Sequence, residues 1–196
     1  MKRLIASMLF LLVLVQPSSP QKGYQNGYIL THHGDTILGI VNDRKVSTLH
    51  SVIYERIRFK PSKSRLFAKK YDASEITGYG YADTHFRSLP FTSEGSFFKT
   101  VNYASGDPVF LKVRSDSYLS LYQSEYVDED GYITSSLFLK RKDESTYTFV
   151  PPIGFRKKML EYFSDAVVIQ QQIQSREYRL RDIEEIGQAY NDLKGQ

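Results

Sequence analysis

Residues 24–150 consist of short runs rich in Tyr, Phe, Val, Ile and Thr, each interrupted by Gly, Asp, Asn or Pro. β-Branched and aromatic residues favour strands, whereas the interrupting residues favour turns. The alternation therefore predicts a sheet of many short strands. We detect no internal repeat and no low-complexity segment in the chain.

The clearest predicted hairpin lies around Gly34-Asp35. Residues 28–33 and 36–41 are both strand-like. We expect Gly34 to take the positive φ of a two-residue type II′ turn between them. Because neighbouring residues on a strand point to opposite faces, the adjacent His32 and His33 are not expected to bind one metal ion.

The next strand is predicted at residues 51–60. Ile57 and Phe59 fall on one face, whereas Arg56, Arg58 and Lys60 fall on the other, as in a half-buried strand that ends at Pro61. Further strands are predicted at residues 65–71, 76–82, 85–91, 97–103, 109–113, 118–126, 132–140 and 146–150, with turns at 72–75 and 130–131.

After Pro151-Pro152 the apolar residues follow a helical period. The three predicted stripes are Phe155, Met159, Leu160 and Phe163, then Val167, Val168 and Ile173, and finally Leu180, Ile183, Ile186, Tyr190 and Leu193. We expect these stripes to pack on the strands, although a protein partner could use the same surface. The predicted fold class is α+β, with a predominantly antiparallel β sheet, as a roll or partly closed barrel, followed by two or three C-terminal helices.

The first 21 residues have the pattern of a secretory signal peptide. Lys2 and Arg3 precede an apolar stretch at residues 4–15, and small or turn-forming residues follow. The alternative is a membrane anchor, but twelve apolar residues are too few for the roughly 20 that span a bilayer. We therefore expect an exported protein, periplasmic or associated with the outer membrane, with no transmembrane span once residues 1–21 are removed. Residues 22–152 would form the β-rich domain, and residues 153–196 a helical segment packed on the same domain.

The composition excludes several functions. The chain has no Cys, so disulfides, thiolate metal sites and cysteine nucleophiles are absent. The net charge of +4 falls to +2 without the two basic residues of the leader, which argues against a nucleic-acid partner. We find no pattern for a catalytic triad, a phosphate loop or a complete calcium loop, and we predict no catalytic residue, metal or cofactor.

Basic and aromatic side chains alternate between residues 54 and 71. The proposed ligand-binding residues are Tyr54, Arg56, Arg58 and Lys60. In an exported protein such a stretch suits a polyanionic glycan or a lipid headgroup. The simpler interpretation, which we favour from sequence, is a solvated strand face followed by a loop.

Several segments resemble a family of uncharacterised exported proteins of Bacteroidetes. The matching elements are residues 27–29, 34–37, Gly39, 71–79, Phe155, Leu160, 162–165, Ile173 and the pair Tyr190-Asn191. The resemblance implies a β-rich envelope module with a helical C-terminus, and it implies no activity.

These observations lead to three hypotheses of function. The first is a non-enzymatic structural or protein-interaction module of the cell envelope, whose partner would be another envelope protein. The alternative is a binding module for a small molecule, an acidic glycan or a lipid headgroup. The weakest is a hydrolase with paired carboxylates, for which Glu55 and Glu75 are the acids to inspect.

Overall fold

The computed structural model describes residues 23–43, 56–62, 67–96, 99–127 and 132–195. Within these ranges the chain forms ten strands. They are β1 (Gln25–Leu30), β2 (Thr36–Asn42), β3 (Arg56–Pro61), β4 (Lys69–Asp72), β5 (Gly78–Tyr81), β6 (Thr84–Ser96), β7 (Lys99–Ser115), β8 (Leu119–Val127), β9 (Ile133–Arg141) and β10 (Thr146–Val150).

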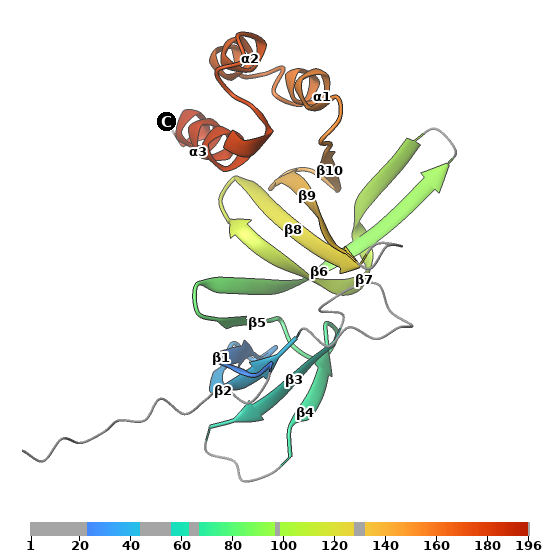
Figure 1. The fold of residues 1–196 in the computed structure, drawn as a ribbon, viewed down its shortest axis with the longest axis vertical. Coiled ribbons are helices and arrows are strands. Elements are labelled where there is room, and N and C mark those ends of the chain that lie inside the picture. Colours follow the sequence, from blue (N-terminus) through green and yellow to red (C-terminus); the bar gives the residue numbers. More distant parts are fainter. Residues whose placement is uncertain (1–22, 44–55, 63–66, 97–98, 128–131, 196) are drawn as a thin grey trace, which may run out of the picture.

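Helices follow the last strand. They are α1 (Phe155–Tyr162), α2 (Val167–Gln174), the short 3-10 helix η1 (Leu180–Asp182) and α3 (Ile183–Lys194). The predicted fold class is confirmed, since an antiparallel sheet is followed by three C-terminal helices. Figure 1 shows the helices at one end of the long axis and β1 to β4 at the other.

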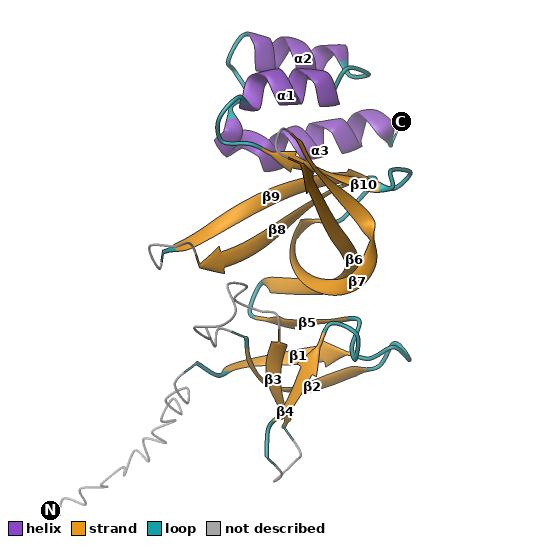
Figure 2. Cartoon of the chain, turned by 90° about the vertical axis from the view of Figure 1, so that its right-hand side faces the viewer, coloured by secondary structure: helices purple, strands orange, loops and turns teal. Residues whose placement is uncertain are grey.

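All strands belong to one sheet with the order β10-β9-β8-β7-β6-β5-β1-β2-β3-β4. An additional antiparallel contact joins β10 to β7, through the pairs Thr146 with Tyr103 and Tyr147 with Asn102. Strands β7 to β10 therefore form a partly closed ring, which is not a complete barrel. Figure 2 shows this ring directly beneath the helices.

One continuous strand, β7, replaces the two strands predicted at residues 97–103 and 109–113. The prediction of two strands is wrong, because Gly106-Asp107-Pro108 lies inside one continuous strand. Gly106 takes a φ of 86°, and the β6–β7 register shifts between Pro90 and Thr92. The strand therefore bends without ending, and its first half contacts β10 while its second half contacts β8.

The loop between β1 and β2 is also longer than predicted. The Thr31 backbone N–H donates to the Asp35 carbonyl at 3.0 Å, so that His32, His33 and Gly34 form a three-residue loop. Gly34 has a φ of 85° and occupies the last loop position, as in a type I turn followed by a left-handed residue. The two histidines therefore lie in the loop and not on a strand.

The first six strands and Phe110 of β7 enclose an N-terminal core. Its fully buried residues include Ile57 and Phe59, as the alternation on β3 predicts. The ring of Tyr79 stacks on Phe86 with centroids 4.4 Å apart, and it meets the edge of Phe110 at 5.0 Å. These aromatic contacts hold β5, β6 and β7 together from inside the core.

Strands β8 and β9 are buried on both faces. Tyr122 and Phe138 point into the ring formed by β7 to β10. Leu121 and Leu139 point outward and contact the helices. The ring is therefore filled by aromatic side chains on one side and covered by the helical layer on the other.

The helical layer confirms most of the predicted stripes. Its buried contacts on the sheet are made by Phe155, Met159, Phe163, Ile169, Ile173, Ile183, Ile186 and Tyr190. The stripe predicted for α2 is wrong in part, because Val167 and Val168 are 62% and 58% exposed. Ile169 and Ile173 carry the buried face of α2, four residues apart as a helix requires.

Candidate functional site

Three of the four proposed ligand-binding residues lie on the outer face of β3. Arg56, Arg58 and Lys60 alternate with the buried Ile57 and Phe59, and we call them the β3 basic row. Tyr54 lies outside the described residues. Alternate residues of a strand are about 6.6 Å apart, so the three charges extend along a line of about 13 Å.

The neighbouring strand extends the positive charge of the row. Lys70 of β4 lies directly opposite Arg58, on the same face of the sheet. Asp72 lies opposite Arg56, and the pKa of its carboxyl is lowered by hydrogen bonds from Ser74 and by the charge of Arg56. Within the described part of the chain, Arg58, Lys60 and Lys70 form no ion pair.

Two histidines and Glu75, one of the two acids of the hydrolase hypothesis, have structural contacts. His32 Nε2 lies 2.9 Å from the Ser74 carbonyl, and the Tyr28 hydroxyl lies 2.6 Å from His85 Nδ1. Glu75 pairs with Lys69 at 3.2 Å, and Glu55 lies outside the described residues. No group of three metal-ligating side chains occurs among the described residues.

Arg141 of β9 is the centre of a network that joins the sheet to the helices. Its guanidinium lies 2.9 Å from the Glu144 carboxylate and 3.1 Å from that of Asp165, and it donates to the Tyr162 carbonyl at 2.7 Å. The Tyr162 hydroxyl donates to Glu144, and the Tyr190 hydroxyl donates to Asp165 at 2.7 Å. We call these five residues the Arg141 network.

Asn191 makes a second connection between α3 and the sheet. Its side-chain amide donates to the Leu119 carbonyl at 2.9 Å and accepts from the Leu119 N–H at 2.7 Å. Asp165, Tyr190 and Asn191 belong to the segments that resemble the Bacteroidetes family. These positions therefore attach the helices to β8 and β9 in this structure.

Two pKa values in the network are shifted in opposite directions. Partial burial of the Asp165 carboxyl opposes its ionisation, but the hydrogen bonds from Lys194 and Tyr190 and the charge of Arg141 hold its pKa below the ordinary value. Burial and the hydrogen bond to Asp165 raise the pKa of Tyr190 to about 12. The network is therefore built around an ionised Asp165 and a protonated Tyr190.

Acidification should weaken this helix attachment. Because the pKa of Asp165 is lower in the folded chain than in the unfolded one, its stabilising effect is present above the unfolded pKa and lost as pH falls through the folded pKa. We expect Asp165→Asn to be less stable than the wild type at pH 7. In urea titrations at successive pH values, the difference in stability between the two proteins should shrink as the pH falls through the folded pKa of Asp165.

The surface variant Asp107→Asn serves as the control, because it changes an exposed carboxylate outside the Arg141 network. Its stability should follow that of the wild type over the whole pH range. A constant difference between Asp165→Asn and the wild type at all pH values would contradict the role of the Asp165 charge.

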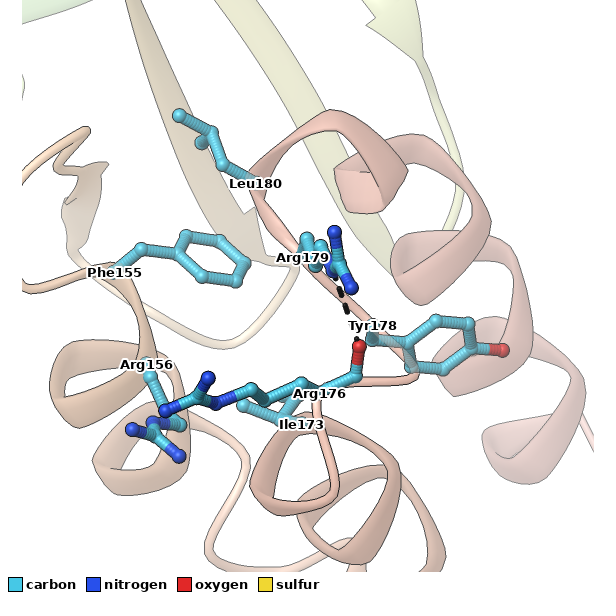
Figure 3. Close-up of a pocket in the computed structure, with 7 residues that line it drawn as sticks. All are labelled: Phe155, Arg156, Ile173, Arg176, Tyr178, Arg179 and Leu180. Atoms are coloured by element: carbon cyan, nitrogen blue, oxygen red, sulfur yellow. Dashed lines mark hydrogen bonds between the residues drawn. The ribbon is translucent and has the colours of Figure 1, made fainter.

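A recess of about 390 Å³ lies among α1, the end of α2 and η1. Figure 3 shows its lining, to which α1 contributes Phe155 and Arg156, and the α2–η1 segment contributes the rest. The lining residues are Phe155, Arg156, Ile173, Arg176, Tyr178, Arg179 and Leu180. We call this site the arginine recess.

None of the three recess arginines is among the binding residues predicted from the sequence. Arg156 is separated from Arg176 and Arg179 by the whole of α2, so only the turn back after α2 brings them to one site. A partial signal existed, because Arg176, Arg179 and Arg181 occur within six residues at the start of the last helical segment. This signal is weak, because basic residues on helices are usually solvated.

Comparison of the chain with known protein families, curated proteins and solved structures finds no match. None of the helices in the described ranges has the length and apolar character needed to cross a membrane.

Proposed function

We propose that the protein is exported, belongs to the resembled Bacteroidetes family, and acts in the cell envelope as a non-enzymatic binding module. Its ligand is a polyanionic glycan that lies along the β3 basic row. The observation that carries the proposal is the line of three cations, Arg56, Arg58 and Lys60, on one face of a strand whose other face is fully buried.

The linear arrangement favours a chain of regularly spaced acidic groups over a flat lipid surface. The cations follow one strand, and only Lys70 adds charge from a neighbouring strand on the same face. A rigid strand also holds the charges at fixed distances, which lowers the entropy lost when a ligand is bound. Export separates the protein from cytoplasmic nucleic acid and leaves acidic glycans and anionic lipids as polyanions, of which the linear row favours the glycan.

Reversing the charges of the β3 basic row tests this proposal. The triple variant Arg56→Glu, Arg58→Glu and Lys60→Glu should bind alginate, a polyuronate, at least roughly 100-fold more weakly than the wild type. The estimate follows from about 1 kcal/mol for each basic residue near an anionic surface. Binding is measured by isothermal titration calorimetry at low ionic strength, and wild-type binding should weaken as salt is added.

The control variant carries Lys112→Glu, Lys142→Glu and Lys157→Glu, which change the net charge equally at positions away from β3. It should retain most of the affinity for alginate. Equal loss in both variants would show that only net charge matters, and equal binding by wild type and the β3 variant would remove the proposal. Preference for phosphatidylglycerol vesicles over alginate would replace the glycan by a lipid surface.

The expectation of a structural or protein-interaction module remains a prediction. It would gain support if an envelope protein were retained equally by the wild type and by the β3 variant. Such a result would place the partner surface away from the β3 basic row.

A further inference from the structure

The arginine recess is lined by three arginines, and Glu177, Asp182 and Glu185 lie close enough to act electrostatically on its lining residue Tyr178. Among the described residues, the side chains of Arg156, Arg176 and Arg179 form no ion pair. The nearby Asp182 accepts the backbone N–H of Arg179 at 2.9 Å and pairs with Arg181 at 3.4 Å. Three like charges around one recess repel each other, and an anionic ligand would relieve that repulsion.

The local hydrogen bonds of these arginines occupy few of their donors. Arg156 Nη1 donates to the Gln174 carbonyl at 3.5 Å, and Arg179 Nε donates to the Arg176 carbonyl at 3.3 Å, as Figure 3 shows for the second bond. Both contacts are long, and each uses one of the five N–H groups of a guanidinium. All three arginine side chains are exposed, so their remaining donors face solvent and are accessible to an anion.

The backbone at Arg176 adds an independent observation. Arg176 follows the end of α2 with a φ of 68°, the left-handed conformation that normally selects glycine after a helix. A non-glycine residue in this region is strained, and such strain persists where the surrounding structure requires it. Its side chain lines the recess, so the strain coincides with the placement of a third cation there.

Three of the other lining residues are apolar, which indicates that the ligand also carries an apolar group. Phe155 and Ile173 are buried, and Leu180 is partly buried beside them. The volume of about 390 Å³ is within the range of small-molecule sites. The first turn of α1 contains no acidic residue, so its positive end also favours an anion.

We propose that the arginine recess binds a small amphiphilic phosphomonoester, with the phosphate held by Arg156, Arg176 and Arg179 and the apolar group placed against Phe155, Ile173 and Leu180. Guanidinium groups match phosphate oxygens in pairs, and a phosphomonoester carries close to two negative charges at neutral pH. This site is at the opposite end of the molecule from the β3 basic row (Figure 1), so the inference goes beyond the proposed function.

Phenyl phosphate is a suitable probe, measured by isothermal titration calorimetry and by its effect on Tm. It should bind the wild-type protein more tightly than inorganic phosphate or phenol, because each of these lacks one half of the expected contacts. Each single variant, Arg156→Gln or Arg179→Gln, should lower the affinity about tenfold or more, as expected for a charge-assisted hydrogen bond.

Arg176→Gly separates binding from folding. Glycine adopts the left-handed conformation without strain, so the Tm of the free variant should equal or exceed that of the wild type. The same variant should bind phenyl phosphate about tenfold more weakly, because one cation is removed. Higher stability together with lower affinity is not expected if Arg176 has only a structural role.

Three results would overturn the inference. The first is phenyl phosphate binding no more tightly than inorganic phosphate, and the second is unchanged affinity in both Arg176→Gly and Arg156→Gln. The third is loss of phenyl phosphate binding in the β3 triple variant, because that would locate the ligand on β3. Conversely, alginate binding should be unaffected by Arg176→Gly, so the two sites succeed or fail separately.

Discussion

Replacement of Tyr79 with alanine is expected to lower the free energy of unfolding by about 3–5 kcal/mol, the usual cost of removing a large aromatic side chain from a core. Tyr79 is among the largest fully buried side chains and contacts both Phe86 and Phe110. The neighbouring strands are held on both edges of β5, so they cannot move inward to fill the space. Urea unfolding followed by circular dichroism measures the change.

The conservative variant Tyr79→Phe is the matched control. It keeps the ring and removes only the hydroxyl that donates to Asp43 at 3.0 Å. Because the Tyr81 hydroxyl donates to the same carboxylate oxygen at 2.9 Å, Asp43 keeps a partner, and we expect a loss of about 1 kcal/mol. Similar losses for alanine and phenylalanine would show that the hydrogen bond, and not the aromatic packing, stabilises this core.

Replacement of Arg141 with alanine is expected to lower the free energy of unfolding by about 3 kcal/mol. Breaking a buried ion pair typically costs 3–5 kcal/mol, and the lower end applies because water reaches part of the network. The Arg141 side chain is 15% exposed, whereas Glu144 and Asp165 are 24% and 42% exposed. The variant also loses the contact of the guanidinium with the Tyr162 ring, at 4.2 Å from its centroid.

Hydrogen exchange shows where the stability is lost. In Arg141→Ala the amides of α1 and α3 should exchange faster, while those of β1 to β3 in the N-terminal core should change little. Arg141→Lys should be intermediate, because lysine keeps the charge but not the planar fork. Lys142→Ala, at the adjacent exposed position, should match the wild type. Equal exchange in Arg141→Ala and wild type would show that the Arg141 network does not attach the helices.

The two proposed binding sites occupy opposite ends of the molecule (Figure 1). The Arg141 network joins β9 to the helical segment through Tyr162 and Asp165. The β3 basic row rests on the N-terminal core, whereas the arginine recess belongs to the helical layer. Loss of helix attachment should therefore affect the recess before it affects the row. Measuring the binding of phenyl phosphate and of alginate to Arg141→Ala therefore shows which of the two sites needs the helical layer.

Local pattern accounts for the parts of the fold that were predicted. Alternation on β3 placed Ile57 and Phe59 inside and the basic row outside, because successive side chains of a strand point to opposite faces. Predictions of strand ends and loop lengths failed where a glycine was compatible with more than one backbone geometry. Gly106 bends β7 without ending it, and Gly34 closes a three-residue loop instead of a two-residue turn.

The sequence by itself determined the strand-rich composition, the alternation on β3, and the change to helical period after Pro152, because each depends on neighbours within a few residues. Only the tertiary structure decided which distant residues meet. The contact of β10 with β7, the Arg141 network and the arginine recess all join residues separated by about twenty positions or more. Such contacts depend on how the strands and helices pack in space. A periodic pattern along the chain does not predict this packing.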